Sequence, residues 1–242
     1  MVKIKFLGTG TSCPTLERVS SSYLLYVGEK KLLIDIGPSV LRRLIEHGLN
    51  VNEVDLIVLT HFHVDHSGDL PAFLFACNYG LEPRRRPLYL LGGDGIKQFF
   101  RNLCNCYPWI KPKHYDLQVL RVVNESYLWN EVKIITKRVN HNRESIALRL
   151  DMGVSLVFSG DTDFSRNLIE LSSGVDLLVV ECSFPERKVK GHLNLHTLRK
   201  MIDKAKPKQV IISHLYPEWD KRMRDSSIPC IIAYDGLEID IG

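Results

Sequence analysis

Residues 60–69, THFHVDHSGD, constrain this chain most, because they place three histidines and two aspartates directly after an apolar run. Clustering imidazole and carboxylate groups with little water around them is costly unless a cation coordinates them. Neutral imidazole and ionised carboxylate are the usual nitrogen and oxygen ligands of zinc and related divalent ions. The pattern H-x-H-x-D-H therefore favours a metal site over histidines that are merely solvated or hydrogen-bonded.

The spacing within this stretch indicates more than one ion. His61 and His63 can aim at one ion while Asp65 and His66 aim at a neighbouring ion. Four ligands are too few to fill two sites of ordinary coordination number. We therefore expect about three more ligands from distant parts of the chain.

Short β-rich runs alternate with helical stretches along the whole chain. Strands are predicted from Val2, Ser22, Lys31 and Asp55 in the first half, and over EVKIITKRV, ESIALRLD, VSLVFSGD, DLLVVEC and KQVIISH in the second. Helices are predicted over 38–47, 70–79, about 165–172 and 194–205. With 45% hydrophobic and 25% charged residues, residues 1–242 are expected to form a single mixed α/β layered domain.

Three of the apolar runs end at residues that can bind a metal. These residues are His61, Asp161 and His214. Strands of α/β proteins deliver the residues that follow them to the crevice at the carboxyl edge of the sheet. Ligands that lie far apart in the sequence can therefore meet in space.

The segment THFHVDH resembles the signature of the metallo-β-lactamase superfamily, whose four-layer αββα sandwich usually holds two metal ions. The resemblance implies a further histidine, a bridging aspartate and a last histidine, which the segments VNHNRES, FSGDT and IISHLY offer. It assigns one ion to His61, His63 and His141 and the other to Asp65, His66 and His214, with Asp161 bridging both.

Asp35, in LLIDIG, follows another apolar run. The resemblance makes it a group that orients the histidine stretch, which is the kind of support that metal ligands need. The alternative is a turn aspartate before Gly37 and Pro38.

Two divalent ions about 3.5–4 Å apart can deprotonate a bridging water and clamp the oxygens of an in-line displacement at phosphorus. Asp65, as a ligand and near neighbour of that water, could orient it or accept its proton. We therefore expect a hydrolase that uses a metal-bridging hydroxide. Nitrogen and oxygen ligands suit zinc first, with manganese and iron as alternatives.

The opening FLGTGTSCP and the run from GHLNLH to ISHLY are similar to the ribonuclease Z and phosphodiesterase branch of this superfamily. In that branch, the histidine that matches His192 stabilises or protonates the leaving side of a phosphodiester. The resemblance thus implies a catalytic role for His192 and a homodimeric assembly. A solvated loop histidine beside Gly191 is the alternative for His192.

Three departures from the branch separate this chain from transfer-RNA processing. Only 20 residues separate His141 from Asp161, where ribonuclease Z inserts a long RNA-binding arm. The bacterial PxKxRN loop reads PTLERV, and the HEAT segment reads VECSF, which keeps Glu181. We therefore expect a phosphodiester substrate and leave open whether it is an RNA 3′ end, a cyclic nucleotide or another small phosphodiester.

The net charge of +4 is compatible with an anionic substrate and decides little else. Arg187, Lys188 and Lys190 lead into His192 and are candidates for phosphate contacts. The cluster of residues 84–86, RRR, is more typical of a solvated face.

Two other functions fit the same residues. A thioester, ester or lactone hydrolase of this fold would use the same metal chemistry at carbon, and a non-catalytic metal-binding module would keep the ions without turnover. Six cysteines at irregular spacings and the absence of a signal-like opening favour a reducing cytoplasm. The apolar runs are too short to span a membrane.

Overall fold

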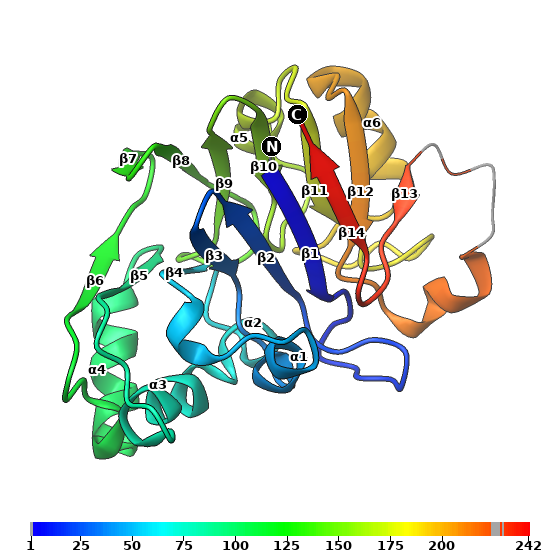
Figure 1. Ribbon diagram of the computed structural model, residues 1–242. Coiled ribbons are helices and arrows are strands. Elements are labelled where there is room, and N and C mark those ends of the chain that lie inside the picture. Colours follow the sequence, from blue (N-terminus) through cyan, green and yellow to red (C-terminus); the bar gives the residue numbers. More distant parts are fainter. Residues whose placement is uncertain (1, 224–227, 229) are drawn as a thin grey trace.

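A computed structural model describes residues 2–223, 228 and 230–242, and shows two seven-stranded sheets packed face to face (Figure 1). The first sheet has the order β14 (Glu238–Ile241), β1 (Val2–Gly8), β2 (Ser22–Val27), β3 (Lys30–Ile34), β4 (Leu56–Leu59), β5 (Leu88–Gly92) and β6 (Leu117–Arg121). The second has the order β13 (Ile231–Ile232), β12 (Gln209–Ser213), β11 (Leu177–Glu181), β10 (Ser155–Phe158), β9 (Ile146–Asp151), β8 (Val132–Arg138) and β7 (Ser126–Trp129).

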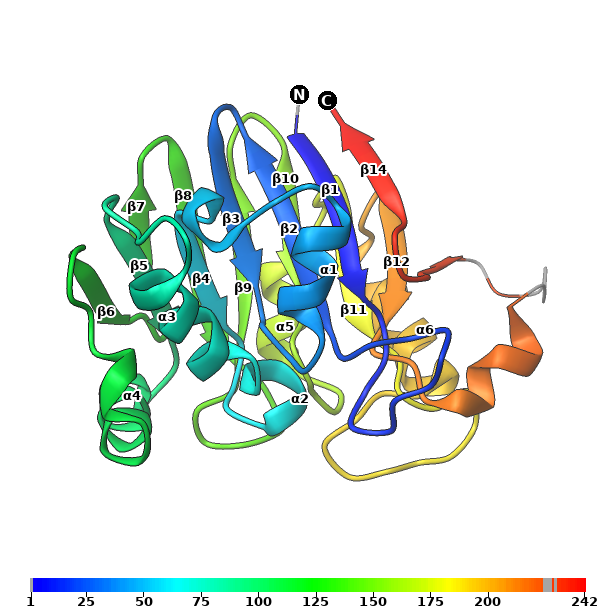
Figure 2. The ribbon, with the colours of Figure 1, turned by 60° about the horizontal axis from the view of Figure 1, so that its bottom comes forward.

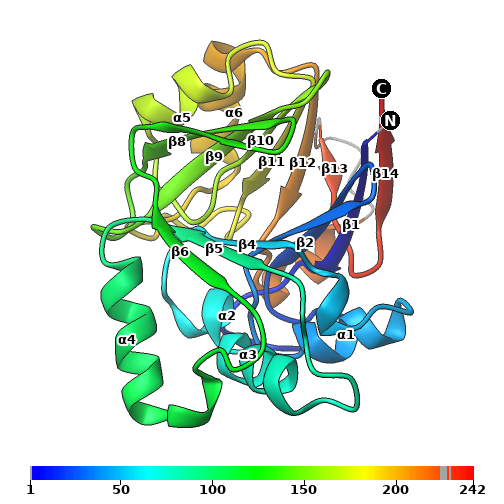
Figure 3. The same cartoon turned by 60° about the vertical axis from the view of Figure 1, so that its left-hand side comes forward.

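Helices cover the outer face of each sheet, which gives four layers (Figure 3). The first sheet carries α1 (Val40–Glu46), α3 (Leu70–Tyr79) and α4 (Ile96–Cys106), and the second carries α5 (Arg166–Leu171) and α6 (Leu195–Ala205). Short helices complete the chain: η1 (Val51–Glu53), α2 (Val64–Ser67), η2 (Pro108–Ile110) and η3 (Pro217–Arg222). The predicted αββα sandwich is thereby confirmed.

Strands that are buried on both faces explain the continuous apolar runs. In β3, Leu32 and Ile34 pack in the core between the two sheets, whereas Leu33 packs against the helices of the outer layer. In β11, Leu177 points into the inter-sheet core and Leu178 into the core beneath α5 and α6. Successive side chains point to opposite faces of a strand, so a strand covered on both sides is apolar throughout.

Strand direction brings the predicted site residues to one edge. Strands β3 to β6 run parallel, as do β10 to β13, and β8 runs in the direction of β10 because both are antiparallel to β9. The carboxyl ends of β3, β4, β8, β10, β11 and β12 therefore share one edge of the sandwich. This edge comes forward in Figure 2, where α2 lies beneath the sheets.

Most predicted elements are present, with ends shifted by a few residues. The structure also contains elements that were not predicted. The strands and helices predicted from the sequence do not include β5, α2, α4, β6, β7, β13 and β14. No helix within the described ranges is long and apolar enough to cross a bilayer. All six cysteines are free thiols.

Candidate metal centre

Asp161 is the centre of a cluster of imidazoles. Its Oδ1 lies 3.3 Å from His66 Nε2, and its Oδ2 lies 3.4 Å from His214 Nε2, 3.7 Å from His61 Nε2 and 3.9 Å from His141 Nε2. The Asp161 side chain is 3% exposed, so water contributes little to solvating this carboxylate. Four imidazole nitrogens thus converge on one buried carboxylate.

The remaining predicted ligands border the same cluster. His63 Nδ1 lies 3.2 Å from His141 Nε2, and Asp65 Oδ2 lies 3.4 Å from His214 Nε2 and 3.8 Å from His66 Nε2. Three groups of donor atoms, each within 4.8 Å of one another, could hold metal ions: His61, His63, His141 and Asp161; Asp65, His66 and His214; and Asp161, His192 and His214. The structure therefore brings together all seven residues that the sequence singled out.

Unsatisfied polar atoms show that this donor set fits a cation. His61 Nε2, His66 Nε2 and Asp161 Oδ1 are buried and have no hydrogen-bond partner. Buried polar atoms are nearly always hydrogen-bonded, because leaving one unpaired costs about 1–3 kcal/mol. A cation bound among these three atoms would satisfy all of them, so the donor set fits a metal ion.

The charges of the cluster also suit a cation. Burial lowers the pKa of His61 well below its ordinary value, which keeps the imidazole neutral as a ligand must be. Burial alone would raise the pKa of Asp161, but His214, His66 and His61 hold it well below its ordinary value. Burial opposes charge on His66 too, yet Asp161 and Asp35 raise its pKa, so this part of the cluster attracts positive charge.

Asp35 orients the histidine stretch from the end of β3. Its Oδ2 lies 2.7 Å from His66 Nδ1, and Thr60 donates both its backbone N–H and its hydroxyl to the same carboxylate at 2.8 Å. The Thr60 hydroxyl lies 3.1 Å from His61 Nδ1. Asp35 adopts a left-handed φ of 59°, an uncommon conformation for a non-glycine residue and one that tends to occur at functional sites. Because Asp35 accepts the Nδ1 proton, His66 Nε2 is left facing the cluster.

The second sheet orients its histidines in the same way. His141 Nδ1 donates to the Gly191 carbonyl at 2.9 Å, and His214 Nδ1 lies 2.9 Å from the Ser183 hydroxyl. His141 follows β8 by three residues, so it too lies at a strand end. Gly191 has φ 88°, and a Cβ there would lie 2.9 Å from His141 Nδ1, so this position requires glycine.

His192 lies at the border of the cluster, with Nδ1 3.0 Å from Glu181 Oε1 and 4.0 Å from Asp161 Oδ2. Burial alone would lower the pKa of His192, but its hydrogen bond to the Glu181 carboxylate raises it above the ordinary value. Glu181, the last residue of β11, also accepts from Thr162 N–H at 2.8 Å and Ser183 Oγ at 2.7 Å. Sequence analysis missed this role for Glu181, although the residue ends an apolar run as the predicted ligands do.

The three basic residues before His192 have different surroundings. Arg187 forms an ion pair with Glu218 at 2.8 Å and lies over the Phe184 ring, whereas Lys188 is exposed. Lys190 lines a surface pocket together with His141. Of the three, Lys190 therefore lies beside the donor cluster.

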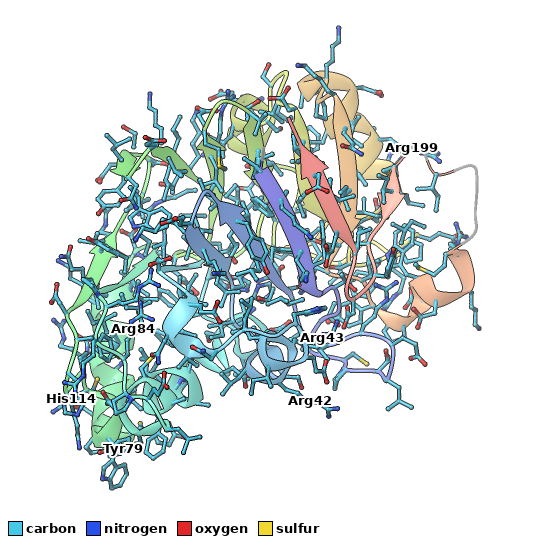
Figure 4. The ribbon with its side chains drawn as sticks, in the orientation of Figure 1. Arg42, Arg43, Tyr79, Arg84, His114 and Arg199 are labelled. Carbon is cyan, nitrogen blue, oxygen red and sulfur yellow. The ribbon has the colours of Figure 1, made fainter. Side chains whose placement is uncertain are left out.

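Arg84 does not belong to a solvated face, and that interpretation of the cluster was wrong for this residue. Its guanidinium is buried and donates to three backbone carbonyls, those of Val51, Arg86 and Pro87. Arg84 is labelled in Figure 4. Arg84 therefore ties together the loops around η1 and β5, and it is unavailable to a substrate.

An αββα sandwich with this donor cluster at its strand ends defines a metal-dependent hydrolase of the metallo-β-lactamase superfamily, in the ribonuclease Z and phosphodiesterase-like branch. The chain belongs to the family described as Anti-Pycsar protein Apyc1, whose model matches residues 2–229.

Individual relatives agree with the assignment to the ribonuclease Z-like branch of the metallo-β-lactamase superfamily. Ribonuclease Z of Mycolicibacterium gilvum is 29% identical over 196 residues, which cover 74% of this chain and 68% of that protein. Ribonuclease Z of Pyrococcus horikoshii is 25% identical, covering 90% and 88% respectively. The crystal structure of the metallo-β-lactamase fold protein YhfI from Bacillus subtilis superposes with a TM-score of 0.85 at 23% identity and covers 98% of both chains.

Proposed function

We propose that this protein is a dinuclear metal-dependent phosphodiesterase whose substrates are small nucleotide phosphodiesters such as cyclic nucleotides. The observation that carries the proposal is that two donor groups meet at one buried carboxylate, Asp161. We assign one ion to His61, His63 and His141 and the other to Asp65, His66 and His214, with Asp161 shared. The nitrogen-rich donor set favours zinc, with manganese and iron as alternatives.

Two divalent ions bound there would lower the pKa of a water molecule and withdraw charge from the phosphoryl oxygens. Asp65 belongs to the second donor group and would orient the attacking water or accept its proton. His192 gives its Nδ1 proton to the hydrogen bond with Glu181, so a protonated ring retains an Nε2 proton for the leaving oxygen. The raised pKa of His192 favours that protonated ring.

The connection between His141 and Asp161 supports a small substrate. It consists of the hairpin β9–β10 and short turns, all of them described by the structure. The long RNA-binding arm that ribonuclease Z inserts there has no counterpart in this connection. RNA 3′ ends nevertheless belong in the test, because the curated relatives are ribonucleases.

The test combines metal analysis of the purified protein with parallel assays on bis(p-nitrophenyl) phosphate, 3′,5′-cyclic nucleotides, a precursor transfer RNA and a thioester. We expect two metal equivalents and cleavage of the first two substrates. A fully metallated protein that leaves every phosphodiester intact refutes the proposal; turnover of the thioester alone indicates an ester hydrolase, and no turnover indicates a binding module.

Two variants test the assigned roles. His63→Ala is expected to lose metal and activity together, because His63 is a ligand in the proposal. His192→Ala is expected to keep the metal and slow turnover. Equal metal loss in both variants contradicts the catalytic role of His192.

We also propose a cytoplasmic location and a homodimer. Free cysteines suit a reducing compartment, and burial raises the pKa of Cys77 to about 11, which keeps that thiol unreactive. A pocket of about 530 Å³ between α1 and α3 is lined by Leu41, Ile45 and Leu81, and its apolar rim suits a second copy. Light scattering coupled to size-exclusion chromatography measures the assembly directly.

A further inference from the structure

A second surface pocket adjoins the donor cluster. Its volume is about 510 Å³, within the range of small-molecule sites. Three segments form it: Asn140, His141 and Asn142 after β8, Asp163 and Phe164 after β10, and the loop that contains Lys190. The His141 ring belongs both to this pocket and to the cluster around Asp161. A ligand with its phosphorus at the cluster can therefore extend into the pocket.

The walls of this pocket are held in place by hydrogen bonds. Asn140 and Asp163 pair through their backbones, with Asp163 N–H donating to the Asn140 carbonyl at 2.9 Å. The Asn140 side chain donates to the Phe164 carbonyl at 2.8 Å, and His141 is tied to the opposite loop through the Gly191 carbonyl. The pocket is thus preorganised from both sides, which reduces the entropy lost on binding.

The Asp163 carboxylate can accept further hydrogen bonds. Its Oδ1 accepts from the Phe164 backbone N–H at 2.7 Å. Among the residues that the structure describes, no other side chain or backbone group donates to this carboxylate. A carboxylate accepts up to about four hydrogen bonds, so Oδ2 can accept from a ligand. In dinucleotide-binding α/β folds, a carboxylate accepts from a ribose hydroxyl in this way.

Lys190 brings the opposite charge to the same pocket. Within the described ranges, it forms no ion pair with Asp163 or with another carboxylate, and its side chain is exposed. A carboxylate and an ammonium that line one pocket without meeting suit a ligand that carries both hydrogen-bond donors and an anionic group. Phe164 adds an apolar aromatic surface to the lining.

We propose that this pocket binds the nucleoside of a nucleotide phosphodiester, with Asp163 accepting a hydrogen bond from a sugar hydroxyl or base amino group and Lys190 meeting the phosphate. A nucleotide is the ligand class that supplies those donors, an anionic phosphate and an aromatic ring together. The inference rests on the proposed phosphodiesterase function, since it places the phosphorus at the donor cluster.

The test compares two substrates: a 3′,5′-cyclic nucleotide, which contains a nucleoside, and bis(p-nitrophenyl) phosphate, which does not. Asp163→Asn keeps the acceptor for Phe164 N–H and removes the charge, and Lys190→Met removes the ammonium. We expect each to raise KM for a 3′,5′-cyclic nucleotide roughly tenfold, the usual effect of losing a charged hydrogen bond. For Asp163→Asn, turnover of bis(p-nitrophenyl) phosphate should stay within about twofold of the parent value. Lys190→Met should weaken both substrates, because both carry the phosphate that Lys190 meets, and metal content should stay within about twofold in each variant. Asp203→Asn and Lys200→Met, at exposed positions of α6, are the matched controls.

Binding measurements separate this inference from the proposed function. Calorimetry with 5′-nucleoside monophosphates reads the pocket without turnover, and weaker binding in Asp163→Asn supports the inference even if no phosphodiester is cleaved. Equal KM values for parent and variants, or equal losses of Asp163→Asn on both substrates, overturn the inference. A short RNA is assayed beside the cyclic nucleotide. The substrate whose KM rises in Asp163→Asn is the one whose nucleoside occupies the pocket.

Discussion

At the scale of single residues, the two ring nitrogens of His63 have different surroundings. Nδ1 faces His141 Nε2 at 3.2 Å, and Nε2 lies 2.9 Å from Asn142 Nδ2, the nitrogen of the side-chain amide. A neutral histidine that binds a metal through Nδ1 carries its proton on Nε2. The Asn142 amide must then present its oxygen to that proton, and the choice between amide oxygen and nitrogen is fixed by such partners.

Asn142 is therefore expected to set the tautomer of His63. Asn142→Leu should weaken metal binding about tenfold, the lower end of the range for partners of metal ligands. Asn142→Asp keeps an acceptor at the same place and should restore the affinity. Competition with a chromogenic chelator measures both, and an unchanged affinity in Asn142→Leu would show that His63 needs no such partner.

His192 links catalysis to pH. Its pKa is raised chiefly by Glu181, against the effect of burial, so the protonated ring persists to higher pH and is lost as pH rises through that raised value. Glu181→Gln keeps a hydrogen-bond acceptor but removes the charge. We expect the alkaline limb of the kcat/KM profile to move to lower pH, with metal content unchanged. If the alkaline limb does not move, it reports the titration of a group other than His192.

At the scale of elements, the strand ends were the predictable part of the site. His61, Asp161 and His214 each follow an apolar run, and this rule alone indicated that they would meet. The helix α4 was also within reach of the sequence, because Ile96, Phe99 and Leu103 recur at helical spacing and pack on one face.

Other elements depend on contacts that no local pattern contains. The histidine stretch turns into α2 where the chain after β3 meets it: Ile36 N–H donates to the His66 carbonyl, and Asp69 N–H donates to the Ile36 carbonyl. β14 pairs with β1 from the opposite end of the chain. The contact between Asn142 and His63 likewise joins two loops that are 79 residues apart.

The packing of α2 against the chain after β3 leaves no room for a side chain at Gly37. A Cβ there would lie 2.1 Å from the Asp65 carbonyl oxygen and 2.5 Å from Ser20 Cβ. Gly37→Ala should displace α2, lower stability by about 1–3 kcal/mol and reduce metal content. Thermal unfolding and metal analysis check this. Gly48→Asn, at an open position where asparagine tolerates the left-handed backbone, is the control; equal effects in both variants contradict the packing argument.

At the scale of the whole molecule, the donor cluster joins the two sheets. The first sheet supplies residues 61–66 and the second supplies His141, Asp161 and His214. Ions bound there connect the two halves of the sandwich. Metal binding and stability are therefore linked.

Removal of metal should destabilise the whole fold. A ligand present at a thousandfold its Kd stabilises by about 4 kcal/mol, so a chelator is expected to lower Tm by roughly 10 °C. Scanning calorimetry with and without EDTA measures the shift. His141→Ala, which removes one donor of the second sheet, should show a smaller chelator effect. A Tm that does not respond to EDTA contradicts the link between the sheets.

The order of these donors along the chain has a consequence for biosynthesis. A ribosome releases residues 61–66 early, but Asp161 comes much later, and His214 follows only after most of the second sheet. The early segment meets the metal pool of the cell with an incomplete donor set. High-affinity capture would therefore wait until His214 has left the ribosome, and any factor that delivers the metal would act on a chain that already contains most of the second sheet.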